Sequence, residues 1–115
     1  MNIEHLVPKL LDITQKKKIS WTEAAAHTLI ARIGGMKFQI SAGFDDDREE
    51  PFYRFNLYES DNAIPYDGRF LDSVYADRFR GIYADLEELY TAARRNALGL
   101  DKVIAEIDVE LDKLL

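Results

Sequence analysis

A β-hairpin in residues 29–40 constrains the fold of this chain more than any other feature of its sequence. Two runs rich in apolar residues flank Gly34 and Gly35, and a two-residue glycine turn supplies the positive φ that tight hairpins require. This turn fixes a register that puts three apolar pairs on one face: Leu29 with Ile40, Ala31 with Phe38, and Ile33 with Met36. The sequence therefore predicts an antiparallel sheet with one apolar face.

The alternation of side chains continues in residues 52–58. Tyr53, Phe55 and Leu57 fall on one side of this segment, and the residues between them fall on the other side. We therefore expect a meander of three antiparallel strands. The segment 64–66 predicts at most the stub of a fourth strand at an edge, because its proline cannot donate a ladder hydrogen bond.

Apolar residues at helical spacing precede and follow this sheet. At the N-terminus they predict a helix over residues 3–17, after which an extended link brings Trp21 onto the core. From about Val74 the spacing changes from two residues to 3.6, which predicts a long helix that ends at Gly99. Asp101 is placed to cap a final helix over 101–114, whose apolar stripe predicts that it docks on the rest of the chain.

The expected fold class is therefore α+β. It comprises a three-stranded antiparallel meander with the N-terminal helix and the two C-terminal helices packed on one face, in the order α-β-β-β-α-α. A length of 115 residues predicts a single domain over residues 1–115, because a chain of this size buries about two thirds of its unfolded surface in one core.

Composition and charge exclude several functional classes. The chain has no cysteine, which excludes disulfides, thiolate metal sites and cysteine catalysis. Its net charge of −6 disfavours duplex nucleic acid, since each neutralised phosphate needs a Lys or Arg. Neither a signal peptide nor a run of eighteen apolar residues occurs, so we expect a cytoplasmic protein without a membrane partner.

The face of the predicted sheet that points away from the core carries the first candidate binding residues. Arg32 lies opposite Lys37 in the hairpin register, and opposed like charges destabilise a sheet unless something offsets them. Arg54 and Tyr58 point to the same side, which gives a cationic and partly aromatic surface. Such a surface suits an acidic peptide or single-stranded nucleic acid. The alternative is a solvated face whose bases pair with Glu59 or with acids on neighbouring loops.

An acidic run between the second and third strands provides the second candidate surface. Its carboxylates belong to Asp45, Asp46, Asp47, Glu49 and Glu50. They would meet a basic protein surface or imitate a row of phosphates, as some nuclease inhibitors do. Their spacing resembles that of a calcium loop, but Pro51 follows where an EF-hand needs glycine and further ligands. We therefore predict no metal site, and the alternative for this run is a charged hairpin tip.

Catalytic signatures are missing from the sequence. His5 and His27 are the only histidines, and neither has a serine or aspartate at a spacing that suggests a triad. Gly34 and Gly35 form a hairpin turn, Gly99 is a helix stop, and no phosphate-binding loop is present. We therefore predict no catalytic residue and no cofactor.

The C-terminal segment carries the only family resemblance. It reads Leu-Tyr-x-x-Ala-Arg-Arg-x-Ala-Leu-Gly-x-Asp from Leu89 to Asp101, and it resembles a closing segment of small, largely uncharacterised bacterial α+β proteins. The resemblance implies the α+β fold and a bacterial or phage-related origin. It implies no activity.

These observations together predict a non-enzymatic protein-binding module of the antitoxin, immunity or inhibitor type, acting by surface complementarity as a monomer or homodimer. One alternative is a carboxylate-based, metal-dependent hydrolase that uses the acids at 45–50. A second alternative is the binding of a ligand or single-stranded nucleic acid on the basic and aromatic sheet face.

Overall fold

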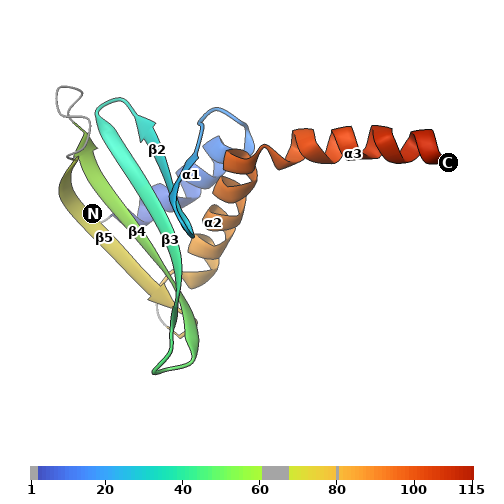
Figure 1. Ribbon diagram of the computed structural model, residues 1–115. Helices are drawn as coiled ribbons and strands as arrows, with labels where there is room; N and C mark the ends of the chain where they lie inside the picture. Colours follow the sequence, from blue (N-terminus) through green and yellow to red (C-terminus); the bar gives the residue numbers. More distant parts are fainter. Residues whose placement is uncertain (1–2, 61–67, 80) are drawn as a thin grey trace.

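The computed structural model describes residues 3–60, 68–79 and 81–115. A five-stranded antiparallel sheet, with its strands in sequence order, forms the centre of the fold (Figure 1). The strands are β1 (Thr22–Ala25), β2 (Thr28–Ile33), β3 (Met36–Asp45), β4 (Glu50–Ser60) and β5 (Gly68–Asp77). A short 3-10 helix (Ile3–His5) leads into α1 (Leu6–Gln15), and α2 (Tyr83–Leu98) and α3 (Leu100–Leu114) follow the sheet. The predicted α+β class is confirmed.

The hairpin predicted from the glycine pair is confirmed residue by residue. Strands β2 and β3 pair with Ile33 opposite Met36 and Arg32 opposite Lys37, as the two-residue turn requires. Gly34 has φ 57°, a left-handed conformation that glycine adopts without steric cost. Strand β4 pairs with β3 and places Phe55 beside Ile40 on the core face.

The predicted number of strands is wrong, since the sheet has five and not three. Residues 68–77 form β5, although the helix was predicted to begin near Val74. Val74 and Ala76 are buried, whereas Tyr75 between them points to the other face. The burial of these positions follows a period of two, and the helix begins only at Tyr83. The extended link also contains a short strand, β1, and the predicted stub at 64–66 lies outside the described residues.

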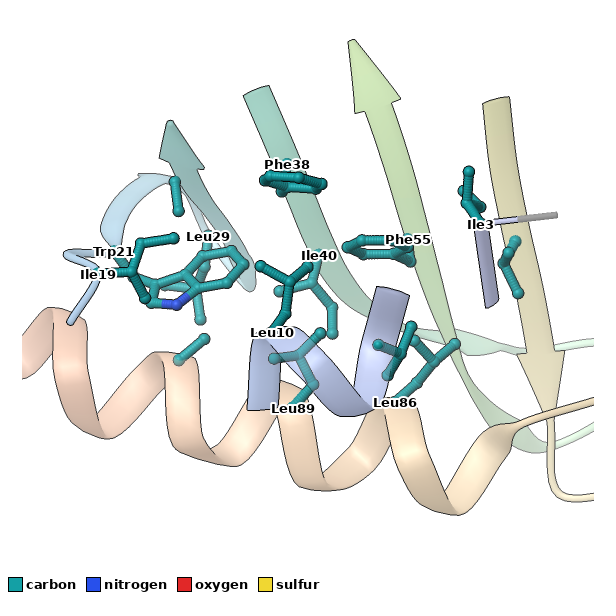
Figure 2. Packing of buried hydrophobic residues seen from close by; sticks show 14 of the residues in the cluster. Ile3, Leu10, Ile19, Trp21, Leu29, Phe38, Ile40, Phe55, Leu86 and Leu89 are labelled. Carbon is teal, nitrogen blue, oxygen red and sulfur yellow. The ribbon is translucent and has the colours of Figure 1, made fainter. Parts of the chain in front are cut away.

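Two helices cover one face of the sheet and enclose the core (Figure 2). Leu86 and Leu89 of α2 and Val7 of α1 are completely buried against Phe55 and Ile40 of the sheet. The rings of Phe38 and Phe55 stack with their centroids 6.0 Å apart. Burying each large aliphatic side chain contributes about 1.5–3 kcal/mol, so this layer holds the helices to the sheet.

The link between α1 and β1 docks through Trp21, as predicted. Its indole is 2% exposed, and Nε1 donates a hydrogen bond of 3.0 Å to Oγ1 of Thr14. Asn96 of α2 holds the same link from the other side: Nδ2 donates to the carbonyl of Ile19, and Oδ1 accepts the N–H of Trp21. Helix α1 ends at Gln15 and not at residue 17, because the chain turns at Lys17 with φ 59°.

The prediction that the last helix docks on the core is wrong. No residue of α3 is buried, and the helix projects away from the sheet and the other helices (Figure 1). Gly99 causes this departure, because its left-handed backbone, with φ 60°, ends α2 and changes the direction of the chain. Asp101 gives no side-chain cap to α3 and instead pairs with Arg95. Only α1 and α2 therefore cover the sheet.

Candidate protein-binding surface

The face of the sheet opposite α1 and α2 brings together the four predicted residues Arg32, Lys37, Arg54 and Tyr58. We call it the open face. Lys37 lies beside Tyr58 in the register of β3 and β4, and its Nζ is 4.5 Å from the centroid of the Tyr58 ring. The ring presents its electron-rich face to the ammonium group. This contact offsets the repulsion between Lys37 and the neighbouring Arg32.

A second cation lies over a second aromatic ring further along the open face. The guanidinium carbon of Arg54 is 5.8 Å from the ring centroid of Tyr75, and that ring contacts Phe52 at 5.2 Å between centroids. Tyr75 falls within the helix predicted from about Val74, and β5 instead brings it to the open face. Lys37 and Arg54 are thereby each supported by an aromatic side chain that the strand pairing holds in place.

Gly43 explains how Phe52 lies flat on this face. The two residues are directly paired between β3 and β4, and a Cβ atom at position 43 would collide with the Phe52 ring. Without that atom, the ring crosses the glycine and reaches Tyr75. Cross-strand aromatic cover of a glycine is a recognised way of stabilising a sheet.

A polar network fixes the middle of the open face. Ser73 Oγ donates to Oδ1 of Asn56 at 2.7 Å, and Nδ2 of Asn56 donates to the Tyr58 hydroxyl at 3.4 Å. Asn56 is 8% exposed, so its amide is held between the strands and not in solvent. The network orients Tyr58 beneath Lys37.

The cations of the open face do not pair with Glu59, which was the predicted alternative. Glu59 accepts a hydrogen bond from Arg69. Within residues 3–60, 68–79 and 81–115, none of Arg32, Lys37 and Arg54 is ion-paired with a carboxylate. Within this part of the chain, the positive charge of the open face is therefore not neutralised by a carboxylate.

The predicted acidic run forms the turn between β3 and β4. Its acids are Asp45, Asp46, Asp47, Glu49 and Glu50. Oδ1 of Asp45 accepts the backbone N–H groups of Asp47 and Arg48 at 3.0 and 3.2 Å, which closes the turn. Arg48 lies 3.5 Å from the buried carboxylate of Asp77 and fastens the turn to β5.

The structure does not bring the acidic turn and the cations together. Asp45 and Lys37 are eight residues apart along β3, which is about 26 Å at 3.3 Å per residue. The acids therefore lie at one end of the sheet, and Arg32 and Lys37 lie at the other.

The described part of the chain contains no group of three or more His, Cys, Asp or Glu residues placed to hold a metal ion.

Sequence reasoning missed a groove of about 850 Å³ between the end of α1, the Trp21 link, α2 and the start of α3. Asp101 lies at its edge and pairs with Arg95 at 2.6 Å and with Lys17 at 3.4 Å. The hydrogen bond from Arg95, followed by that from Lys17, lowers the pKa of Asp101 below its ordinary value. A polar Asn96 at the edge of the apolar stripe of α2 was the one signal of this groove in the sequence.

Comparisons with protein-family models, with curated proteins and with solved structures find no match to this chain. None of the described helices has the length and apolar character needed to cross a membrane.

Proposed function

We propose that this chain is a non-enzymatic protein-binding module of the antitoxin, immunity or inhibitor type, and that it binds its partner with the open face. One observation carries the proposal. Arg32, Lys37 and Arg54 share a sheet face opposite α1 and α2, and no carboxylate among the described residues neutralises them.

The partner segment that fits this face is extended and acidic. Arg54 pairs with Ser41 of β3, which is four residues from Lys37 on the same strand. Lys37 and Arg54 are therefore separated by about 13 Å along the sheet. Two carboxylates four residues apart in an extended segment span a similar distance. Charge-assisted hydrogen bonds from the two cations would fix the position of such a segment.

Single-stranded nucleic acid is the second candidate ligand, and the geometry supports it less. Binding of unpaired bases relies on aromatic faces that are free for stacking. Here Lys37 lies over Tyr58 and Arg54 lies over Tyr75, so two of the rings on this face are already occupied by cations, while Phe70 beside Tyr58 is exposed. The net charge of −6 also opposes a polyanion.

Affinity capture from the lysate of the native host, followed by mass spectrometry, tests the proposal. We expect one dominant protein to bind the native chain and to be lost with the double variant Arg32→Glu, Arg54→Glu. The variant Arg69→Glu, Arg94→Glu makes the same change of charge at exposed sites outside the open face and should retain the protein. Retention of the same protein by the Arg32→Glu, Arg54→Glu variant would contradict the proposed surface.

The hydrolase alternative depends on metal binding by the acids at 45–50. A metal that binds only the native state raises the melting temperature, so thermal unfolding with millimolar Ca²⁺, Mg²⁺ or Mn²⁺ tests it directly. We expect no shift, because Asp45 uses one carboxylate oxygen to close the turn. A clear rise that is lost in an Asp46→Asn, Asp47→Asn variant would favour the hydrolase.

A further inference from the structure

An exposed apolar stripe runs along α3. It consists of the half-buried Leu100 and of the exposed residues Ile104, Ile107, Leu111 and Leu114, at spacings of four, three, four and three residues. This spacing is the repeat with which one helix packs side by side against another. Ile104 and Ile107 are each 51% exposed and Leu114 is 83% exposed, so the stripe is not covered in the chain itself.

Carboxylates flank both edges of this stripe. At 100° per residue, Asp101, Asp108 and Asp112 follow one edge, and Glu106 and Glu110 follow the other edge. Lys102 and Lys113 fall on the reverse side of the helix. The segment after Gly99 thus carries five acids and two bases, and its acids border the apolar surface.

This distribution of charge selects among possible occupants. A second copy of α3 would bring carboxylates against carboxylates in either orientation, since both edges of the stripe are acidic. Anionic lipid would also be repelled by the carboxylates. A helix whose apolar stripe is bordered by Lys or Arg meets attraction at both edges.

We propose that α3 is a docking helix for a partner helix with a two-heptad apolar stripe flanked by basic residues. The proposal does not rest on the function of the open face. Helix α3 projects from the C-terminal end of α2, away from the sheet, and contributes nothing to that face (Figure 1). It gives the chain a second interface, of opposite charge to the first.

A titration of the isotopically labelled full chain, followed by NMR, tests the docking. The probe is a 21-residue helical peptide with leucine at the seam positions and lysine at the flanking positions. The matched probe has glutamate at the flanking positions. We expect the lysine peptide to shift signals of residues 100–115 and to bind at least tenfold more tightly than the glutamate peptide.

Charge reversal makes the test specific. The variant Asp108→Lys, Glu110→Lys should reverse the preference between the two peptides. The variant Asp46→Lys, Asp47→Lys makes the same change of charge in the β3–β4 turn and should leave the preference unchanged. Ile107→Asn should weaken binding of the lysine peptide at least tenfold while the signals of the core residues stay in place, because Ile107 packs against nothing in the core.

Three results would overturn the proposal. The first is equal affinity for the two peptides. The second is a dimer of the native chain that becomes a monomer with Ile107→Asn, since a second copy would then cover the stripe. The third is binding to phosphatidylcholine vesicles that depends on Ile107, which would identify a lipid surface. The Arg32→Glu, Arg54→Glu variant should bind the lysine peptide like the native chain, so failure of either interface is seen separately.

Discussion

Helices α2 and α3 are neighbours in the sequence, have nearly the same length and both carry an apolar stripe, yet only one of them belongs to the core. Leu86, Leu89 and Ala93 of α2 are completely buried. No residue of α3 is buried, and Ile107 in the middle of its stripe is 51% exposed. Regular spacing of apolar residues thus predicts that a helix has a partner surface without showing whether that surface lies in the same chain.

The residue between the two helices decides the difference. Gly99 adopts φ 60° and separates a helix that follows the sheet from one that leaves it. Before this residue, Asn96 ties α2 to the link through the backbone of Trp21 and Ile19. After it, the described contacts that hold α3 include the exposed ion pairs of Asp101.

The largest expected effect is a contrast between equivalent truncations of the two helices. Leu89→Ala should lower the free energy of unfolding by about 2–5 kcal/mol, because it leaves a cavity in a filled core. Ile107→Ala should change it by less than about 0.5 kcal/mol, as is usual for exposed sites. Urea unfolding followed by circular dichroism measures both. Similar losses for the two variants would mean that α3 docks on the core after all.

The anchor at the end of α2 should have the next largest effect. Asn96→Ala leaves the N–H of Trp21 and the carbonyl of Ile19 without their amide partner, which should cost about 1–3 kcal/mol. Thr91→Ala, an exposed position on the same helix, is the matched control and should be close to neutral. Urea unfolding of the two variants distinguishes the loss of the Asn96 hydrogen bonds from a change in helix propensity. Equal free energies of unfolding for the two variants would contradict the role of Asn96 in holding the link.

A smaller loss of stability is expected from substitutions of Gly99, which lies between α2 and α3. Gly99→Ala forces a Cβ atom into a left-handed conformation and should cost about 1–2 kcal/mol. Gly99→Asn should cost less, because asparagine tolerates this conformation. Thermal unfolding ranks the two variants. If neither variant changes the melting temperature, residue 99 has left the left-handed conformation and α2 continues directly into α3. Small-angle scattering should then show a longer molecule.

The smallest effect concerns the first turn of α3. The pKa of Asp101 lies below its ordinary value of 3.8 because Arg95 and Lys17 favour the charged carboxylate. The stabilisation of the fold by the charged Asp101 is therefore complete above the pKa that this residue has in the unfolded chain. It is lost as the pH falls through the lower pKa of Asp101 in the folded chain. NMR titration of the carboxyl carbon should give a midpoint below 3.8, and Arg95→Gln should raise it. A midpoint at or above 3.8 in the native chain would contradict the pairing.

Local rules predicted what local chemistry determines. The register of β2 and β3 follows from the two-residue turn, and the placement of Arg32 opposite Lys37 follows from that register. The same reasoning failed at Val74, where a stretch of strand also matches helical spacing, because only the pairing with β4 distinguishes the two. The third strand was correctly placed beside β3, and so Arg54 and Tyr58 were placed on the correct face.

Contacts between distant parts of the chain could not be predicted in this way. The side chain of Asn96 binds the backbone of Trp21 and Ile19, which precede it in the sequence by 75 and 77 positions. Arg54 lies over Tyr75 only because β5 returns beside β4, and the prediction of a helix from about Val74 excluded this strand. The aromatic support of Arg54 therefore depends on this late strand.

The contact between Gly43 and Phe52 has a consequence for the history of this sequence. A side chain at position 43 and a ring lying across it exclude each other, so Gly43 is not free to change while the Phe52 ring keeps this position. Any relative that keeps the aromatic support of the open face should therefore carry both residues, separated by a turn of similar length. The pair is a marker by which distant relatives can be recognised, even where the acids between its members have been replaced.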